Sequence, residues 1–165
     1  MYWVDYFYQI CLMAARKQMS GESGGLSVSK AYLAALAAKD QKVNPLFYTL
    51  KARLIRAEGG QAEIRMPVTG DIVQGGGMVA GGILATLADE AMAHAVLSSL
   101  DENMRAVTSE MNIRYLRGAS PQDGGELVAQ ARVVRMGKHI CVTEAQVSDD
   151  RNRLLATAGA SFFLQ

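Results

Sequence analysis

Asp89 is the residue whose type and surroundings point most directly to chemistry. It lies in the apolar run 81–100, whose spacing of large side chains predicts a helix. At about 100° per residue, the face expected to pack on the rest of the fold consists of Ile83, Leu84, Leu87, Ala88, Ala91 and Ala95. The side that carries Asp89 is also apolar and holds Ala85, Met92, Ala93 and Val96. A surface helix would be polar there, so we expect another subunit or a long loop to cover this side.

A carboxylate in apolar surroundings is costly unless it is hydrogen-bonded, and a carboxylate held in this way suits a general base. Asp89 is therefore the candidate catalytic residue. The alternative is a solvent-exposed aspartate at an imperfect interface, and the pattern alone does not decide between the two. Glu90 points elsewhere on the helix and is predicted to be a surface charge.

The sequence Val79-Ala80-Gly81-Gly82 directly precedes the helix and offers a second chemical feature. Backbone N–H groups at a helix start are unpaired and partly positive, so they suit a developing oxyanion. Glycines there let a substrate carbonyl approach the backbone closely. An ordinary flexible loop is the alternative. The segment is not a phosphate loop, because no Gly-Lys-Ser/Thr follows it and no GxGxxG opens a βαβ unit.

The composition restricts the class of protein. A chain of 165 residues that is half apolar can bury the core of one domain. Its 17 basic and 16 acidic residues give no support to a nucleic-acid-binding function. Cys11 and Cys141 lie far apart, and only two histidines are present. Since a zinc site needs about four ligands, we expect no metal site and no disulfide, which fits a reducing cytoplasm.

Residues 1–25 are predicted to be an N-terminal extension, and residues 26–165 to form the domain. The apolar start is interrupted by Asp5 and Gln9, and basic residues follow it. It is too short for a membrane span and has the wrong charge order for a secretory signal. The alternative to a plain extension is an interfacial membrane anchor.

The periodicity predicts the elements that position the candidate residues. We expect a short helix from Ser27 or Ser29 to about Lys39, ended well before Pro45, and a hairpin that turns at Gly59-Gly60. After the glycine-rich loop and the long helix come four strands joined by turns, at 105–117, 126–136, 139–148 and 154–164. Runs of strands, without βαβ alternation, predict an α+β fold with an antiparallel sheet.

The run from Gln74 to Asp89, QGGGMVAGGILATLAD, resembles the motif of the PaaI-like branch of the hotdog thioesterase superfamily. The segments 111–117 (MNIRYLR) and 133–138 (VVRMGK) resemble the next two strands of that family and their turn. The resemblance covers about Asn44 to the C-terminus. It implies a hotdog fold, in which a curved antiparallel sheet wraps around one central helix. It also implies a homodimer or a dimer of dimers, with active sites at the subunit interface.

The same resemblance implies roles for individual residues. Asp89 would be the general base or nucleophile toward a thioester, and the Gly81 N–H would polarise its carbonyl. Gln74 would position the water or the thioester opposite the partner's Asp89. Thr108 would hold the water, although a plain β-branched strand residue is an equal alternative. The CoA moiety would be met by four further residues: Gly82, Arg117, Arg135 and Lys138. For the three basic residues, a plain solvated position at a strand end is an equal alternative.

The chain departs from the family motif at one position, because Ala80 stands where relatives carry histidine. The resemblance therefore predicts an acyl-CoA thioesterase without metal or cofactor, acting on a small, aryl or medium-chain acyl group. A non-catalytic acyl-CoA-binding or regulatory protein is the alternative that Ala80 keeps open. The missing histidine argues against the dehydratase branch of hotdog proteins, which relies on a histidine paired with an acidic residue. His94 is predicted to be a satisfied core residue, and His139 to lie at the surface.

Overall fold

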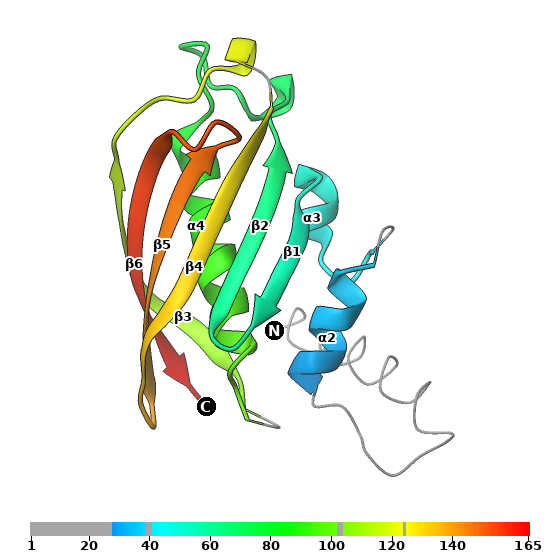
Figure 1. Ribbon diagram of the computed structural model, residues 1–165, viewed down its shortest axis with the longest axis vertical. Helices are drawn as coiled ribbons and strands as arrows, with labels where there is room; N and C mark the ends of the chain where they lie inside the picture. The colour runs from blue at the N-terminus through cyan, green and yellow to red at the C-terminus, as the bar shows by residue number, and fades with distance from the viewer. Residues whose placement is uncertain (1–27, 39–40, 102–103, 124) are drawn as a thin grey trace.

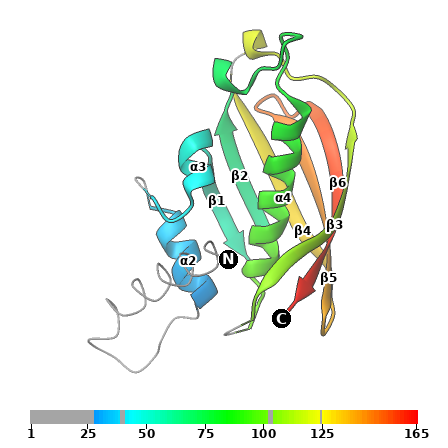
Figure 2. The ribbon, with the colours of Figure 1, turned by 180° about the vertical axis from the view of Figure 1, so that it is seen from behind.

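The computed structural model describes residues 28–38, 41–101, 104–123 and 125–165. One long helix, α4 (Gly81–Leu97), lies against one face of a six-stranded antiparallel sheet, and the sheet curves around it (Figures 1 and 2). The fold is the α+β hotdog architecture that the resemblance implies. The predicted extension 1–25 lies outside the described residues, as does Cys11.

The sheet has the strand order β1-β2-β4-β5-β6-β3. Its strands are β1 (Arg53–Glu58), β2 (Gln61–Pro67), β3 (Ala106–Tyr115), β4 (Glu126–Met136), β5 (Ile140–Asp149) and β6 (Leu154–Leu164). The four predicted later strands agree with these bounds to within one or two residues. The β1–β2 turn forms at Gly59 and Gly60, as predicted, and both have positive φ angles of 55° and 78°.

The connection after β3 differs from the prediction of turns between neighbouring strands. β3 pairs with β6 at the edge of the sheet, whereas β4 pairs with β2 on the other side of β5. Residues 116–125, which include the short helix η2 (Pro121–Asp123), therefore cross from one edge of the sheet toward its other half. The packing of the sheet around α4 decides which strands distant in sequence become neighbours. Local turn signals in the sequence do not predict these pairings.

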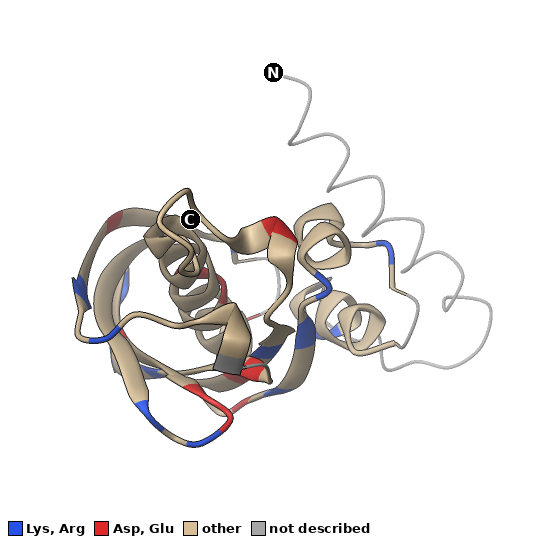
Figure 3. Cartoon of the chain, turned by 90° about the horizontal axis from the view of Figure 1, so that it is seen from above, with Lys and Arg blue, Asp and Glu red and all other residues tan. Residues whose placement is uncertain are grey.

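Two helices, α2 (Val28–Leu36) and α3 (Pro45–Leu50), lie beside the β1 edge of the sheet, as the view from above shows (Figure 3). Helix α3 is not predicted from the sequence, because Pro45 is expected there to break helical structure, whereas Pro45 starts a helix. Asn44 caps it, since its side chain accepts a hydrogen bond from the Phe47 N–H at 3.1 Å. Proline is well suited to the first position of a helix, where its missing N–H costs nothing.

α4 is buried on more sides than one, and it ends at Leu97 instead of the predicted Leu100. Of the six residues predicted to face the core, Leu84, Leu87, Ala88, Ala91 and Ala95 are at most 3% exposed, whereas Ile83, in the first turn, is only partly buried. Met92 and Val96, on the side of Asp89, are fully buried too. Ala85, Asp89 and Ala93 remain partly exposed and form a narrow stripe, four residues apart, that the described chain leaves open. Among the helices of residues 28–165 that are described, none is long and apolar enough to cross a membrane.

We expect the Asn44→Ala substitution to lower the free energy of unfolding by about 1–2 kcal/mol. Loss of a helix N-cap costs about 1 kcal/mol, and the Asn44 amide also donates a hydrogen bond to the Tyr32 hydroxyl at 3.1 Å. Urea denaturation measures the change. Asn112→Ala is the matched control, because the exposed Asn112 amide makes one hydrogen bond, to Gly159 O. Equal losses in the two variants would contradict a special role for Asn44.

Candidate active site

Asp89 is held by a residue from the neighbouring edge strand. The Thr108 hydroxyl, on β3, donates a hydrogen bond to Asp89 Oδ1 at 2.9 Å. Asp89 is partly buried on the open stripe of α4, and Thr108 is exposed. Because the hydrogen bond occupies one carboxylate oxygen and fixes its orientation, Oδ2 stays available for a water or a substrate atom. Thr108 therefore contacts the candidate catalytic carboxylate itself.

The start of α4 is fixed by the loop that leads into it. The Val79 N–H donates to Ala119 O and the Ala80 N–H to Ile72 O, each at 2.9 Å. Ala80 is the N-cap residue, and an alanine side chain cannot accept a hydrogen bond from the first turn. The N–H groups of Gly81 and Gly82 therefore stand at the positive end of a 17-residue helix without a cap. This arrangement can stabilise a negatively charged oxygen.

Gln74 lies at the same end of α4 as Gly81. It follows the short helix η1 (Gly70–Ile72), and its backbone N–H donates to Met78 O at 2.8 Å. Its exposed side chain accepts a hydrogen bond from the Gly76 N–H at 2.7 Å. Gly77 closes this turn with a φ of 80°, and the Val73–Val79 bridge joins the two chain segments on either side of it just before the helix start.

The two halves of the predicted site do not meet within one chain. Gly81 and Asp89 are eight residues apart on α4, and a rise of 1.5 Å per residue separates them by about 12 Å. A general base, a water and a carbonyl held by an oxyanion donor need about 3 Å for each contact. Asp89 and the Gly81 N–H of one chain are too far apart to act on one thioester carbonyl.

The basic residues predicted to meet CoA lie at both ends of the sheet. The Arg117 N–H donates to Leu155 O, at the start of β6, whereas Arg135 and Lys138 flank the β4–β5 turn. That turn lies near Phe163, at the end of β6, because Ile140 pairs with Phe163. At about 3.3 Å per residue, the two ends are roughly 26 Å apart. All three side chains and Gly82 are exposed.

Glu90 is not the surface charge that the helix pattern predicts. Its side chain is only 23% exposed, and it accepts a hydrogen bond from Asn44. Asn44 lies at the start of α3, so α2 and α3 cover this side of α4. The Asn44-Pro45 pair is the signal that could have revealed this cover, because it marks a helix start.

His94 is the satisfied core residue that was predicted, at 2% exposure. Its Nδ1 lies 2.6 Å from Glu90 O, and its Nε2 lies 3.3 Å from the Tyr32 hydroxyl. The rings of Tyr32 and Phe47 pack against it, with centroids 5.8 and 5.2 Å away. Nδ1–H therefore donates to the backbone and Nε2 accepts from Tyr32, which is the pattern of a neutral imidazole. His139 is exposed, as predicted, and Cys141 is fully buried.

This polar cluster contains two shifted titrations. Burial, and then the neighbouring charge of Asp89, raise the pKa of Glu90 from 4.5 to about 7, against the Asn44 hydrogen bond, which lowers it. Burial lowers the pKa of His94 from 6.5 to about 4, against its backbone hydrogen bond to Glu90. The 3.7 Å contact between His94 Nδ1 and Glu90 Oε2 is therefore not an ion pair at neutral pH.

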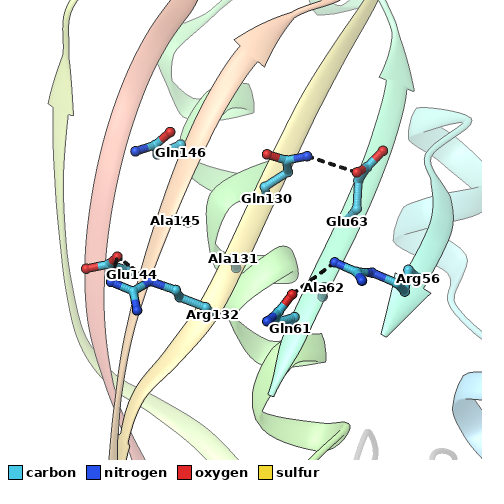
Figure 4. A pocket seen from close by; sticks show the side chains of 10 residues that line it. All are labelled: Arg56, Gln61, Ala62, Glu63, Gln130, Ala131, Arg132, Glu144, Ala145 and Gln146. Atoms are coloured by element: carbon cyan, nitrogen blue, oxygen red, sulfur yellow. Dashed lines mark hydrogen bonds and ion pairs between the residues drawn. The ribbon is translucent and has the colours of Figure 1, made fainter. Parts of the chain in front are cut away.

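Two hollows of the described chain lie away from Asp89. The first, of about 300 Å³, is on the sheet face that points away from α4 (Figure 4). Its carboxylates are already hydrogen-bonded, Glu144 to Arg132 and Glu63 to Gln130. The second, of about 730 Å³, lies between α2, α3 and β1. Neither is lined by Asp89 or Gly81, because the candidate site is open along one side of α4.

Comparisons with known proteins agree with the fold and the motif. The model of the thioesterase superfamily matches residues 76–156. A protein of Archaeoglobus fulgidus, named provisionally as an esterase, is 30% identical over 74% of this chain and 76% of its own length. A 1,4-dihydroxy-2-naphthoyl-CoA hydrolase of Listeria monocytogenes is 28% identical over 65% of this chain and 85% of its own length.

Solved structures give the same picture. A conserved protein of Pseudomonas aeruginosa is 29% identical, with a TM-score of 0.70 over 78% of this chain and 99% of that chain. The PaaI protein of Escherichia coli, from the phenylacetic acid degradation operon, is 27% identical, with a TM-score of 0.66 over 73% of this chain and 83% of that chain.

We expect Glu90→Gln to change how stability depends on pH. A raised folded pKa means that ionising Glu90 costs folding free energy, and this cost grows from about pH 4.5 to about pH 7 and is full above it. The variant should therefore be more stable than the wild type at pH 8, by at most about 3 kcal/mol, and by no more than about 1 kcal/mol at pH 5.

Urea denaturation at the two pH values measures the difference. The contribution of His94 titration to stability cancels, because both proteins retain this residue. Glu58→Gln is the control, since the Glu58 side chain is 74% exposed. A gain at pH 5 as large as that at pH 8 would show that Glu90 is not the titrating group.

Proposed function

Because the chain belongs to the thioesterase superfamily and is a thioester hydrolase, we propose that it hydrolyses acyl-CoA to the free acid and CoA, with Asp89 as the general base or nucleophile. The observation that carries this proposal is the hydrogen bond from Thr108 to Asp89 Oδ1. It holds a partly buried carboxylate on an otherwise apolar stripe, with one oxygen free. A carboxylate in that state is suited to act on a thioester at neutral pH.

As general base, Asp89 takes a proton from a water while the water oxygen bonds to the thioester carbon. The carbonyl π pair moves to oxygen, where backbone N–H groups at Gly81 stabilise the oxyanion. The oxyanion then collapses and the C–S bond breaks. CoA leaves as the thiolate and takes up the proton, so that acid and thiol are the products. As nucleophile, Asp89 would bond to the thioester carbon and expel CoA as the thiolate. Water would then hydrolyse the resulting anhydride to the acid and the free Asp89 carboxylate, with the second proton of the water going to the thiolate.

The separation of about 12 Å between Gly81 and Asp89 supports a site shared by two chains, in a homodimer or a dimer of dimers. β3 offers the surface for pairing, because it is an edge strand that pairs, among the described residues, with β6 alone. An open edge of this length readily adds another strand. Antiparallel pairing of two β3 strands would bring the Asp89 of one chain toward the Gly81 and Gln74 of the other.

The same two-fold arrangement accommodates the basic residues. Arg117 lies at the Tyr115 end of β3, and Arg135 and Lys138 lie near the Thr108 end. In a two-fold dimer the two ends of β3 exchange places, so Arg117 of one chain would approach Arg135 and Lys138 of the other. Arginine side chains there would contact CoA phosphates with charge-assisted hydrogen bonds.

The acyl group is proposed to be aryl or of medium length. Ala85 and Ala93 flank Asp89 on the open stripe and leave space beside the carboxylate. The similar Listeria enzyme is named for a naphthoyl-CoA substrate, and the similar PaaI protein comes from an operon for an aromatic acid. Ala80 removes the family histidine from the loop before α4, and the backbone hydrogen bonds of Val79 and Ala80 hold that loop without it.

We expect Asp89→Asn to lower kcat by at least about a hundredfold, because the amide cannot accept the proton of water. Thiol release is measured with acetyl-, hexanoyl-, benzoyl- and 1,4-dihydroxy-2-naphthoyl-CoA. Asp101→Asn, an exposed aspartate beyond the helix, is the control and should match the wild type. Binding without turnover of all four thioesters by the wild type would favour a non-catalytic acyl-CoA-binding protein. Equal turnover by Asp89→Asn would remove Asp89 from the reaction.

A shared site also predicts complementation between inactive variants. Asp89→Asn and Gln74→Ala chains, unfolded together and refolded at equal amounts, should recover about a quarter of wild-type activity, because half of the two-fold dimers are mixed and each has one intact site of two. Each variant refolded alone is the control. Activity no higher than the mean of the two variants would place each site within one chain.

A further inference from the structure

Tyr115, at the end of β3, contacts the start of α4 in two ways. Its hydroxyl donates a hydrogen bond to Gly81 O at 3.0 Å. Its ring lies so close to Gly81 that a Cβ atom there would be 3.3 Å from Tyr115 Cζ. Glycine at position 81 thus allows the Tyr115 ring to cover the first peptide of the helix. A larger side chain at position 81 would push the ring aside.

A bulge in β3 allows Tyr115 to reach this position together with Thr108. The two residues are seven apart, and in a regular strand an odd spacing places side chains on opposite faces. The pairing of β3 with β6 shifts by one residue between Thr108 and Glu110, which is the signature of a bulge. Ser109 is the extra residue, and its hydroxyl donates to Ser161 O at 2.8 Å.

The partners on β6 confirm that both side chains face α4. Thr108 pairs with Phe162, and Tyr115 pairs with Ala156. Phe162 and Ala156 are at most 1% exposed, so their side chains point into the core around the helix. One strand therefore contacts α4 at both of its chemically important positions, Asp89 through Thr108 and Gly81 through Tyr115.

Tyr115 ties the helix start to the sheet in a way that the loop before it does not. The backbone hydrogen bonds of Val79 and Ala80 end one residue before Gly81. Thr86 donates to Gly82 O at 2.9 Å, but it lies on the same helix and moves with it. The Tyr115 hydroxyl joins the first helical peptide to a strand of the sheet.

We propose that Tyr115 is a positioning residue for the oxyanion site, which holds the Gly81–Gly82 peptide so that the N–H groups at the helix start face the thioester carbonyl. This inference rests on the proposed thioesterase function. Donors that are held in place before the reaction stabilise the charge that develops in the transition state. They contribute much less to binding of the neutral substrate. Loss of the Tyr115 hydroxyl should therefore lower kcat and leave KM nearly unchanged.

The test is Tyr115→Phe, which keeps the ring against Gly81 and removes only the hydroxyl. We expect kcat to fall about tenfold on the thioester that the wild type hydrolyses fastest among acetyl-, hexanoyl-, benzoyl- and 1,4-dihydroxy-2-naphthoyl-CoA. Complete loss of an oxyanion donor typically costs about 100- to 1,000-fold, and here the donors remain but are held less firmly. KM and the melting temperature should stay close to those of the wild type. Tyr48→Phe is the matched control, because Tyr48 is 65% exposed on α3, away from the site.

A spectroscopic measurement separates positioning from a general structural effect. The same thioester, carrying a ¹³C carbonyl, is bound to Asp89→Asn, which is expected not to turn it over. Polarisation by the N–H groups should lower the carbonyl stretching frequency relative to the free thioester. Addition of Tyr115→Phe to this variant should move the band back toward the free value.

The outcomes are distinguishable. Wild-type kcat in Tyr115→Phe, or an unchanged carbonyl band, would overturn the role of Tyr115 and leave the thioesterase proposal standing. A lower kcat together with a lower melting temperature and an unchanged carbonyl band would also overturn it, because the loss of activity would then come from a general loss of stability. No turnover of any of the four thioesters by the wild type would contradict the proposed function itself, and the inference with it.

Discussion

The enclosure of α4 by the curved sheet is the constraint on which the rest of the molecule depends. The helix is apolar on nearly all sides, so no single layer can remove it from water. The sheet covers one side and Tyr32 and Phe47 of α2 and α3 cover another, while the stripe of Ala85, Asp89 and Ala93 stays partly open. The candidate chemistry lies on that stripe, because it is the part of a buried helix that a substrate or a second chain can still reach.

Three polar residues near the middle of α4 show how a buried helix accommodates them. Asp89 accepts a hydrogen bond from Thr108 and keeps one oxygen toward the open stripe. Glu90 and His94 face the two N-terminal helices, where Asn44 and Tyr32 supply their partners. The cost of burial appears in the raised pKa of Glu90 and the lowered pKa of His94. Adjacent carboxylates on one helix therefore have different environments, and Asp89 is the one that we propose meets the substrate.

Strand β3 connects the fold to the site. It lies at the edge of the sheet, pairs with β6 alone, and carries the bulge at Ser109 that turns both Thr108 and Tyr115 toward α4. The fixed rise of the helix separates Gly81 from Asp89 by about 12 Å, so one strand can contact both positions but one substrate carbonyl cannot. An edge strand that contacts both half-sites is also the natural surface for a second chain.

Much of this protein follows from local pattern in its sequence. Periodicity predicts α4 and the strands, the paired glycines predict the β1–β2 turn, and the run from Gln74 to Asp89 identifies the family and the candidate carboxylate, because these signals depend on residues close together in the chain. The sequence did not reveal α3, the partners of Glu90, the pairing of β3 with β6, or the contact of Tyr115 with Gly81. Each of these depends on contacts between residues far apart in the chain, or on one extra residue in a strand, and only the packing of the sheet around α4 decides them.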